Sequence, residues 1–157
     1  MRVVPTALLA ADGTMTAAEV RGPLSVAEID ATEDMWYPFL LNATQTLLQS
    51  GVPVRQLPQH KHWMWSNKAR RYHGIPGYAF FGVFCAGGTE GLMLFNTVRE
   101  CRLPSQKNAP LVYVDYLATA PWNIHPLSNT PRYIGASVSH YSSLRQRTAG
   151  ISGWAVG

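Results

Sequence analysis

Short apolar runs separated by turn-forming residues predict most of the strands of this chain. Residues 2–10 are apolar and partly β-branched, and Asp12 and Gly13 mark a turn before a second apolar stretch at 17–20. Residues 78–98 form two apolar runs split by the glycine-rich segment 87–91. These patterns predict a hairpin-like pair at the start of the chain and an antiparallel hairpin with a glycine turn at 78–98.

Three later segments add a strand, a helix and a short final strand. Residues 110–119 are nearly continuous in apolar character, which predicts a strand that is central in its sheet. Segment 132–137 leads into a helical pattern that carries Val138, Tyr141 and Leu144 on one face and ends at Gly150. The last apolar residues, 151–156, predict a strand that is cut short.

The segment between the two expected hairpins has helical periodicity. Ser25 can cap a first turn that holds Glu28, and a longer helix carries apolar residues on one face. Because proline is tolerated in the first turn of a helix but not in its interior, we expect a second helix to begin near Pro38 and to end at Gly51. The apolar residues of that helix are Phe39, Leu40, Ala43, Leu47 and Leu48.

Composition favours one folded domain, residues 1–157, with a surface that is poor in charge. Apolar residues make up 46% of the chain, whereas charged residues make up only 14%, which favours association. The net charge of +4 suits a small polyanionic ligand but is too mild to indicate nucleic acid. The basic run of Lys68, Arg70 and Arg71 is expected to be a solvated face, with a nucleic-acid module as the alternative.

The cysteines and the lack of a long apolar run indicate where the protein resides. Cys85 and Cys101 sit in or beside apolar runs and are expected as buried free thiols, which fits a reducing cytoplasm. No apolar run approaches the roughly 18 residues of a membrane span, and residues 1–9 lack the pattern of a signal peptide. We therefore expect a cytoplasmic protein with no membrane partner.

The histidines do not predict a metal site. His60, His62 and His73 have no close carboxylate or thiol to complete a ligand set, so we expect surface histidines and no metal. His140 is expected to be exposed on its helix, with a proton relay as the alternative. Trp63 and Trp65 are expected at the rim of the core, although they could line an acceptor pocket.

The segment with the most chemical content is the loop-to-helix joint at Arg132, Gly135 and Ser137. The first turn of a helix has unpaired N–H groups and the positive end of the dipole, and a glycine there lets a phosphate approach several amides. The alternative is a plain joint between a loop and a helix.

In this context the chain resembles the GNAT superfamily of acyl-CoA-dependent N-acyltransferases, over most of its length. The resemblance lies in the order helix pair, hairpin, strand ending in Leu-Ala-Thr-Ala-Pro, an Arg-x-x-Gly-x-Ser turn opening a helix, and a further strand. It implies an α+β (mixed α/β) fold with a central mixed, mostly antiparallel sheet flanked by helices in three layers, and acetyl-CoA as acyl donor. By the resemblance, the turn that holds the coenzyme A pyrophosphate is Arg132, Tyr133, Ile134, Gly135, Ala136 and Ser137, and the pantetheine arm and acyl carbonyl lie on Leu117, Ala118 and Thr119.

Three features depart from the family pattern. Ser137 stands where the family has Gly or Ala, and its hydroxyl could itself donate a hydrogen bond to a phosphate. The approach at 122–132 is longer than usual and could form a substrate wall. By the resemblance, the given sequence would end inside the fifth strand, and we expect the position of the tyrosine that often serves as general acid to lie outside it.

Acyl transfer to an amine needs a base and a stabilised oxyanion. The attacking amine must lose a proton, and Asp115 is the candidate base because it lies two residues before Leu117 on an otherwise apolar strand. Burial there would bring its basicity toward the useful range. The oxyanion donor would be a strand amide near Leu117 or Ala118. The alternative is that Asp115 caps a loop or faces solvent.

These observations predict an N-acetyltransferase that moves an acetyl group from acetyl-CoA to a primary amine on a small molecule, peptide or protein. The alternative is a non-catalytic GNAT-like module that binds acyl-CoA or a protein partner. Because 151–156 would form an apolar edge with unpaired amides, we also expect a homodimer or higher oligomer in which this segment packs on a neighbouring chain.

Overall fold

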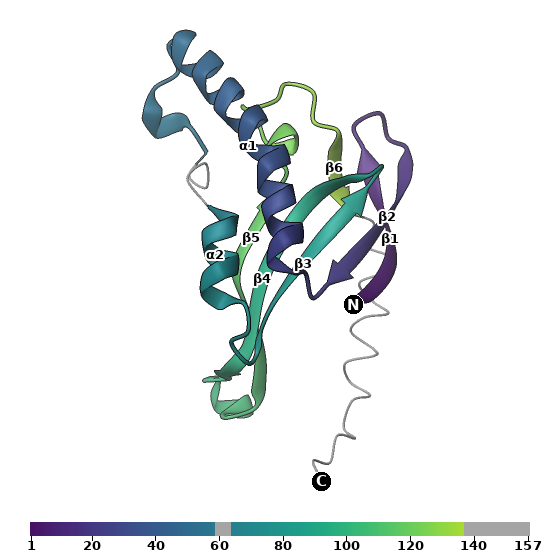
Figure 1. Ribbon diagram of the computed structural model, residues 1–157, viewed down its shortest axis with the longest axis vertical. Helices are drawn as coiled ribbons and strands as arrows, with labels where there is room; N and C mark the ends of the chain where they lie inside the picture. Colours follow the sequence, from purple (N-terminus) through teal and green to yellow (C-terminus); the bar gives the residue numbers. More distant parts are fainter. Residues whose placement is uncertain (59–63, 137–157) are drawn as a thin grey trace.

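The computed structural model describes residues 1–58 and 64–136, and these form an α+β fold around one curled sheet. Six strands follow one another in the order β5-β4-β3-β2-β1-β6, and every neighbouring pair is antiparallel (Figure 1). The elements are β1 (Arg2–Ala10), β2 (Met15–Gly22), α1 (Val26–Gln49), η1 (Val54–Gln56), α2 (Trp65–Tyr72), β3 (Tyr78–Cys85), β4 (Gly88–Glu100), η3 (Pro104–Gln106), β5 (Pro110–Thr119), η4 (Pro121–Asn123) and β6 (Tyr133–Ala136).

Both expected hairpins are present. In the first, Asp12 Oδ1 accepts a hydrogen bond from the Thr14 amide over 2.9 Å, and Gly13 adopts a φ of +86°. In the second, the turn is shorter than expected. Only Ala86 and Gly87 lie between the strands, both at positive φ, which is the geometry of a two-residue hairpin turn. The rest of the expected glycine turn, 88–91, is the start of β4.

Helix α1 begins as expected but does not break. Ser25 and Glu28 form a reciprocal capping box at its N-terminus. The expectation of a new helix near Pro38 is wrong, because α1 runs through this residue to Gln49. Pro38 is exposed, whereas Trp36 and Phe39 on either side of it contact the same core cluster. Packing of these two rings therefore carries the helix past the proline.

The core lies between the two helices and one face of β3, β4 and β5. The register places Phe80 beside Leu94 and Leu92 beside Ala118, so alternate residues of three strands share that face. Ile29 of α1 packs on them in the same cluster. Both described helices cover this one face (Figure 1), and the helix expected to end at Gly150 lies outside the described residues.

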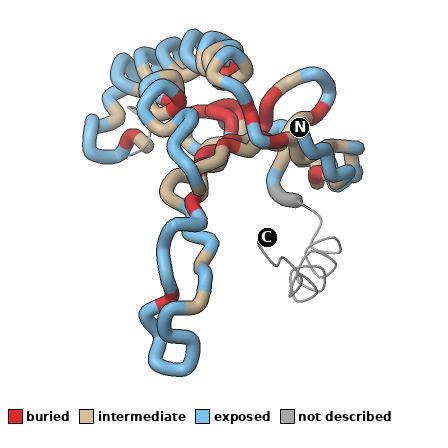
Figure 2. Tube along the Cα trace, turned by 60° about the horizontal axis from the view of Figure 1, so that its bottom comes forward, coloured by how far each residue is buried: buried red, intermediate tan, exposed pale blue. Residues whose placement is uncertain are grey.

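Strand β5 has a different place from the one expected. It is the first strand in the sheet order, so among the described strands it lies at an edge rather than in the centre. Val112 and Leu117 are each 65% exposed, which shows that its apolar character does not come from cover on both faces. The far half of the β4–β5 hairpin extends away from the helices and is mostly exposed (Figure 2).

No helix in the described part of the chain is both long and apolar enough to cross a bilayer. The expected final strand at 151–156, and with it the proposed oligomer contact, falls outside the residues that the structure describes.

Candidate functional site

A β-bulge places Asp115 at the outer strand of the sheet. Leu94 pairs with Tyr116 and Phe95 pairs with Val114, so Asp115 is the extra residue of the bulge on β5. A bulge interrupts the strand ladder and re-aims the side chain of the extra residue. The Asp115 side chain is 17% exposed, so its carboxylate is partly shielded and still reachable from solvent.

Two neighbouring side chains hold the Asp115 carboxylate. Asn96 Nδ2 donates a hydrogen bond to Asp115 Oδ2 over 2.5 Å, and Arg99 Nη2 lies 4.0 Å from Asp115 Oδ1. Asn96 is fully buried, and its Oδ1 has no hydrogen-bond partner in the described structure. Because the Arg99 contact is at the limit of an ion pair, Oδ1 of Asp115 can still accept a hydrogen bond from another donor.

The expected acyl-binding residues follow directly on β5. Leu117 is exposed and Ala118 is buried against Leu92, as alternation along a strand requires. Within the described residues, β5 pairs with β4 alone, so the main-chain groups on its outer side have no strand partner there. Thr119 is exposed, and its Oγ1 donates to the Glu90 carbonyl over 3.1 Å.

The buried carboxylate of Glu90 connects the end of β5 to the start of β6 through hydrogen bonds. This residue is not among the site residues that the sequence predicted. Glu90 is 5% exposed, and its Oε2 accepts hydrogen bonds from Trp122 Nε1 at 2.7 Å and Asn123 Nδ2 at 2.8 Å. Asn123 Oδ1 in turn accepts from the amides of Arg132 and Tyr133 at 2.9 and 3.0 Å. The signal that points to Glu90 is a single acidic residue inside an otherwise apolar, glycine-rich run.

This network brings part of the expected cofactor set together. Arg132 is exposed, and its guanidinium lies over the ring of Trp122, 4.7 Å from the centroid. Tyr133 Oη is 3.2 Å from Cys85 Sγ, and this hydrogen bond, with burial second, raises the pKa of Tyr133 to about 12. Arg132 and Tyr133 are therefore linked to Thr119 through Glu90 and Asn123.

The rest of the expected phosphate turn takes a different conformation. Tyr133–Ala136 is strand β6, and Gly135 and Ala136 pair with Leu9 and Leu8 of β1. The expectation of a turn at Gly135 is corrected, because main-chain groups of this segment pair with β1 instead. Ile134 is exposed, and Ser137 lies outside the described residues.

The basic run on α2 is engaged by neighbouring groups. Lys68 Nζ lies 4.7 Å from the centroid of the Tyr116 ring, and burial, which desolvates the ammonium, lowers the pKa of Lys68. Arg70 pairs with Asp30 at 3.0 Å, and Arg71 lies over the ring of Tyr72. Glu33 of α1 accepts from the first amides of α2 and so fixes the position of this helix.

The expected histidine and tryptophan positions can be followed only in part. His73 is exposed, while His60, His62, Trp63 and His140 lie outside the described residues. In residues 1–58 and 64–136, no group of three histidine, cysteine or acidic side chains could hold a metal ion. Trp65 belongs to the buried core cluster, deeper than the expected position at the core rim, and does not line an open pocket in the described structure.

The chain matches no family model, and no curated protein or solved structure matches it significantly.

Proposed function

We propose that this chain is an N-acyltransferase that moves an acetyl group from acetyl-CoA to a primary amine. The observation that carries the proposal is the bulge at Asp115. It puts a solvent-reachable carboxylate two residues from exposed Leu117, on a strand whose outer main-chain groups have no strand partner in the described structure. A base and adjacent amide donors are what attack of an amine on a thioester requires.

Strand β5 is an edge strand among the described strands and can bind the acyl donor as an extended ligand. An extended chain can bind to an open sheet edge through main-chain hydrogen bonds, and the pantetheine arm is an extended chain with amide groups. We assign the main chain at Leu117, Ala118 and Thr119 to this contact. Bound acetyl-CoA supplies the activated acyl group.

Arg132 is the residue that fits the phosphates best. Its guanidinium is exposed and stacks on the ring of Trp122, and its main-chain amide donates to Asn123. These two contacts orient Arg132 near the C-terminal end of β5. Guanidinium groups bind phosphate through parallel N–H donors. This assignment replaces the turn at Gly135 as the source of the main phosphate contact.

Asp115 acts as the base in the proposed reaction. Oδ1 takes one proton from the ammonium, the freed amine nitrogen bonds to the acyl carbon and loses its second proton to solvent, and the carbon–sulfur bond breaks. An outer amide of β5 near Leu117 or Ala118 donates to the oxyanion, and the departing thiolate takes a proton from solvent.

Thiol release from acetyl-CoA in the presence of an amine panel tests this proposal. We expect amine-dependent release that follows saturation kinetics, and calorimetric binding of acetyl-CoA that Arg132→Gln weakens. The matched control is Arg55→Gln, which removes an exposed arginine on η1. Absence of both binding and release would reject the proposal.

The second candidate is a non-catalytic module that binds acyl-CoA or a protein partner. It is favoured by the pairing of Gly135 and Ala136 with β1, which occupies main-chain groups of the expected phosphate turn. The thiol-release assay separates the two candidates, because a module that binds acyl-CoA would bind acetyl-CoA in the calorimeter and release no thiol with any amine.

A further inference from the structure

The end of the β4–β5 hairpin that carries its connecting loop, residues 98–113, is held by its own hydrogen bonds, and we call it the arm. It projects away from the two helices and from the core that they cover (Figure 2). The Cys101 amide donates to the Ala109 carbonyl and the Asn108 amide to the Cys101 carbonyl, both over 2.9 Å. These bonds and η3 close the tip of the arm, so the side chains that it carries have a defined frame.

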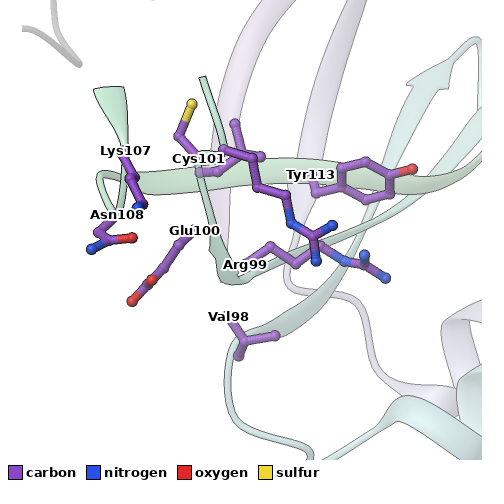
Figure 3. A pocket seen from close by; sticks show the side chains of 9 residues that line it. Val98, Arg99, Glu100, Cys101, Lys107, Asn108 and Tyr113 are labelled. Carbon is purple, nitrogen blue, oxygen red and sulfur yellow. The ribbon is translucent and has the colours of Figure 1, made fainter. Parts of the chain in front are cut away.

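The arm carries a pocket of about 670 Å³. Figure 3 shows Arg99, Lys107 and Tyr113 among the side chains that line it. This volume is in the range of small-molecule sites. The charged residues of the lining are three cations, Arg99, Arg102 and Lys107, and one anion, Glu100.

The cations of the arm are largely uncommitted. In the described part of the chain, neither Arg102 nor Lys107 has an ion-pair partner, and both are exposed. The basic run on α2 differs in this respect, because Arg70 there forms an ion pair with Asp30 at 3.0 Å. A concave surface with an excess of one charge raises the local concentration of the opposite ion.

Arg99 connects this pocket to the proposed base. Its guanidinium lies 4.7 Å from the centroid of the Tyr113 ring, and one of its nitrogens lies 4.0 Å from Asp115 Oδ1. The Arg99 side chain is 55% exposed, so it can turn toward an anion in the pocket at little cost. An anion bound there would draw Arg99 away from Asp115 and leave that carboxylate available to an ammonium.

We propose that the arm pocket binds the carboxylate or phosphate of a small acceptor whose amine lies at Asp115. The acceptor is thus a small zwitterion, with its negative group on Arg99, in the positive field of Arg102 and Lys107, and its ammonium on the Asp115 carboxylate. The identification of the occupant as an acceptor rests on the proposed function, whereas the anion site itself does not.

Anion binding is tested directly with inorganic phosphate and with succinate, titrated at constant ionic strength and followed by amide NMR shifts. We expect saturable shifts in residues of the arm and at least about tenfold weaker binding in the double variant Arg102→Gln/Lys107→Gln, which loses two charge-assisted contacts. The matched control, Arg2→Gln/Arg55→Gln, removes the same charge from exposed positions outside the arm and should bind as the parent does.

Equal weakening in the two double variants, or no saturable binding of either anion, would overturn the anion site. So would binding of an RNA or DNA oligonucleotide with a steep salt dependence, lost in the arm variant, when neither small anion binds. That result would make the arm a nucleic-acid surface.

Paired acceptors test the assignment of the occupant. Alanine is compared with alaninamide, and phosphoethanolamine with ethanolamine, in the thiol-release assay. We expect kcat/KM to be at least about tenfold higher for the anionic member of each pair, and this preference to disappear in Arg102→Gln/Lys107→Gln. Release without an anionic preference would overturn this inference and leave the proposed function standing. Saturable anion binding with no release from any amine would leave the anion site but overturn the acceptor and the proposed function together.

Discussion

Glu90 Oε2 on β4 accepts a hydrogen bond from Trp122 Nε1 over 2.7 Å, and both residues are buried. Trp122 lies on η4, in the segment that joins β5 to β6, the two strands at opposite ends of the sheet order. The same oxygen accepts from Asn123, so one buried carboxylate fixes the loop that follows β5. Through the two amides bound to Asn123, it also fixes where β6 begins. Glu90 therefore positions Arg132, the proposed phosphate contact, without touching any ligand itself.

Replacing Glu90 with glutamine should destabilise the fold by about 1–3 kcal/mol, because a neutral amide oxygen accepts the two buried hydrogen bonds more weakly than a carboxylate oxygen does. Urea unfolding measures this change. The control, Glu100→Gln on the exposed arm, should stay within about 0.5 kcal/mol of the parent. Equal stability of the two variants would mean that the Glu90 network contributes nothing net to the fold.

The same substitution should also loosen the segment between η4 and β6, which the Asn123 bonds hold. Acetyl-CoA affinity should then fall in Glu90→Gln while the rate at saturating acetyl-CoA changes less. Amide hydrogen exchange at Arg132 and Tyr133 reports the loosening independently of activity.

Asp115→Asn should lower the rate of thiol release by about 10² to 10⁴ with little change in acetyl-CoA affinity, as the loss of a general base does. The asparagine oxygen can still accept from Asn96, so the fold should survive. Asp34→Asn on α1 is the control, because Asp34 is exposed on the described surface. Turnover of Asp115→Asn within a few-fold of the parent would assign Asp115 a structural role.

Local signals in the sequence predicted the elements whose cause is also local. The turn at Asp12 and Gly13, the cap at Ser25 and the glycine-rich hairpin each depend on a few neighbouring residues, and each is present in the structure. Pro38 misled because its effect on α1 is decided by the core contacts of Trp36 and Phe39, which no local rule contains.

Long-range pairing explains what the sequence could not predict about the site. Strand β5 has the composition of a central strand, yet its place is set by which strand pairs beside it, and that is a property of the whole sheet. Gly135 fits both a phosphate turn and a strand, and pairing with Leu9 decides between them. The sequence identifies Asp115 as a lone charge on the strand, whereas the bulge that places it appears only in the register with β4.

The capping box of α1 predicts a dependence of stability on acid. Hydrogen bonds from the Ser25 amide and, next, from its hydroxyl lower the pKa of Glu28 below its ordinary value of 4.5. The carboxylate form therefore adds stability that is fully present above about pH 4.5 and is lost as pH falls through the lower folded value. Because Glu28 is solvent-screened, we expect the contribution to be about 0.3–1 kcal/mol.

Urea unfolding of the parent and of Glu28→Gln, at neutral pH and near pH 3, measures this contribution. Glutamine keeps the shape of the capping box and cannot ionise, so the difference between the two proteins should shrink in acid. A difference that is the same at both pH values would show that the charge of Glu28 has no role in the cap.

The contact between Tyr133 and Cys85 predicts that Tyr133 ionises at a higher pH than an ordinary tyrosine. Its hydrogen bond with the buried thiol is the largest cause of the raised pKa, about 12 against the ordinary 10, and the negative charge of Glu90 adds to it. A raised folded pKa adds stability that is fully present below about pH 10 and is lost as pH rises through 12.

The chain has seven tyrosines, so phenolate absorbance must be followed as the difference between the parent and Tyr133→Phe. Cys85→Ala should move this difference titration toward the ordinary value, and Glu90→Gln should move it less, while Cys101→Ala, a substitution in the arm, should leave it in place. A titration that Cys85→Ala leaves near 12 would refute the link between β3 and the start of β6, and with it the geometry that places Tyr133 beside the proposed site.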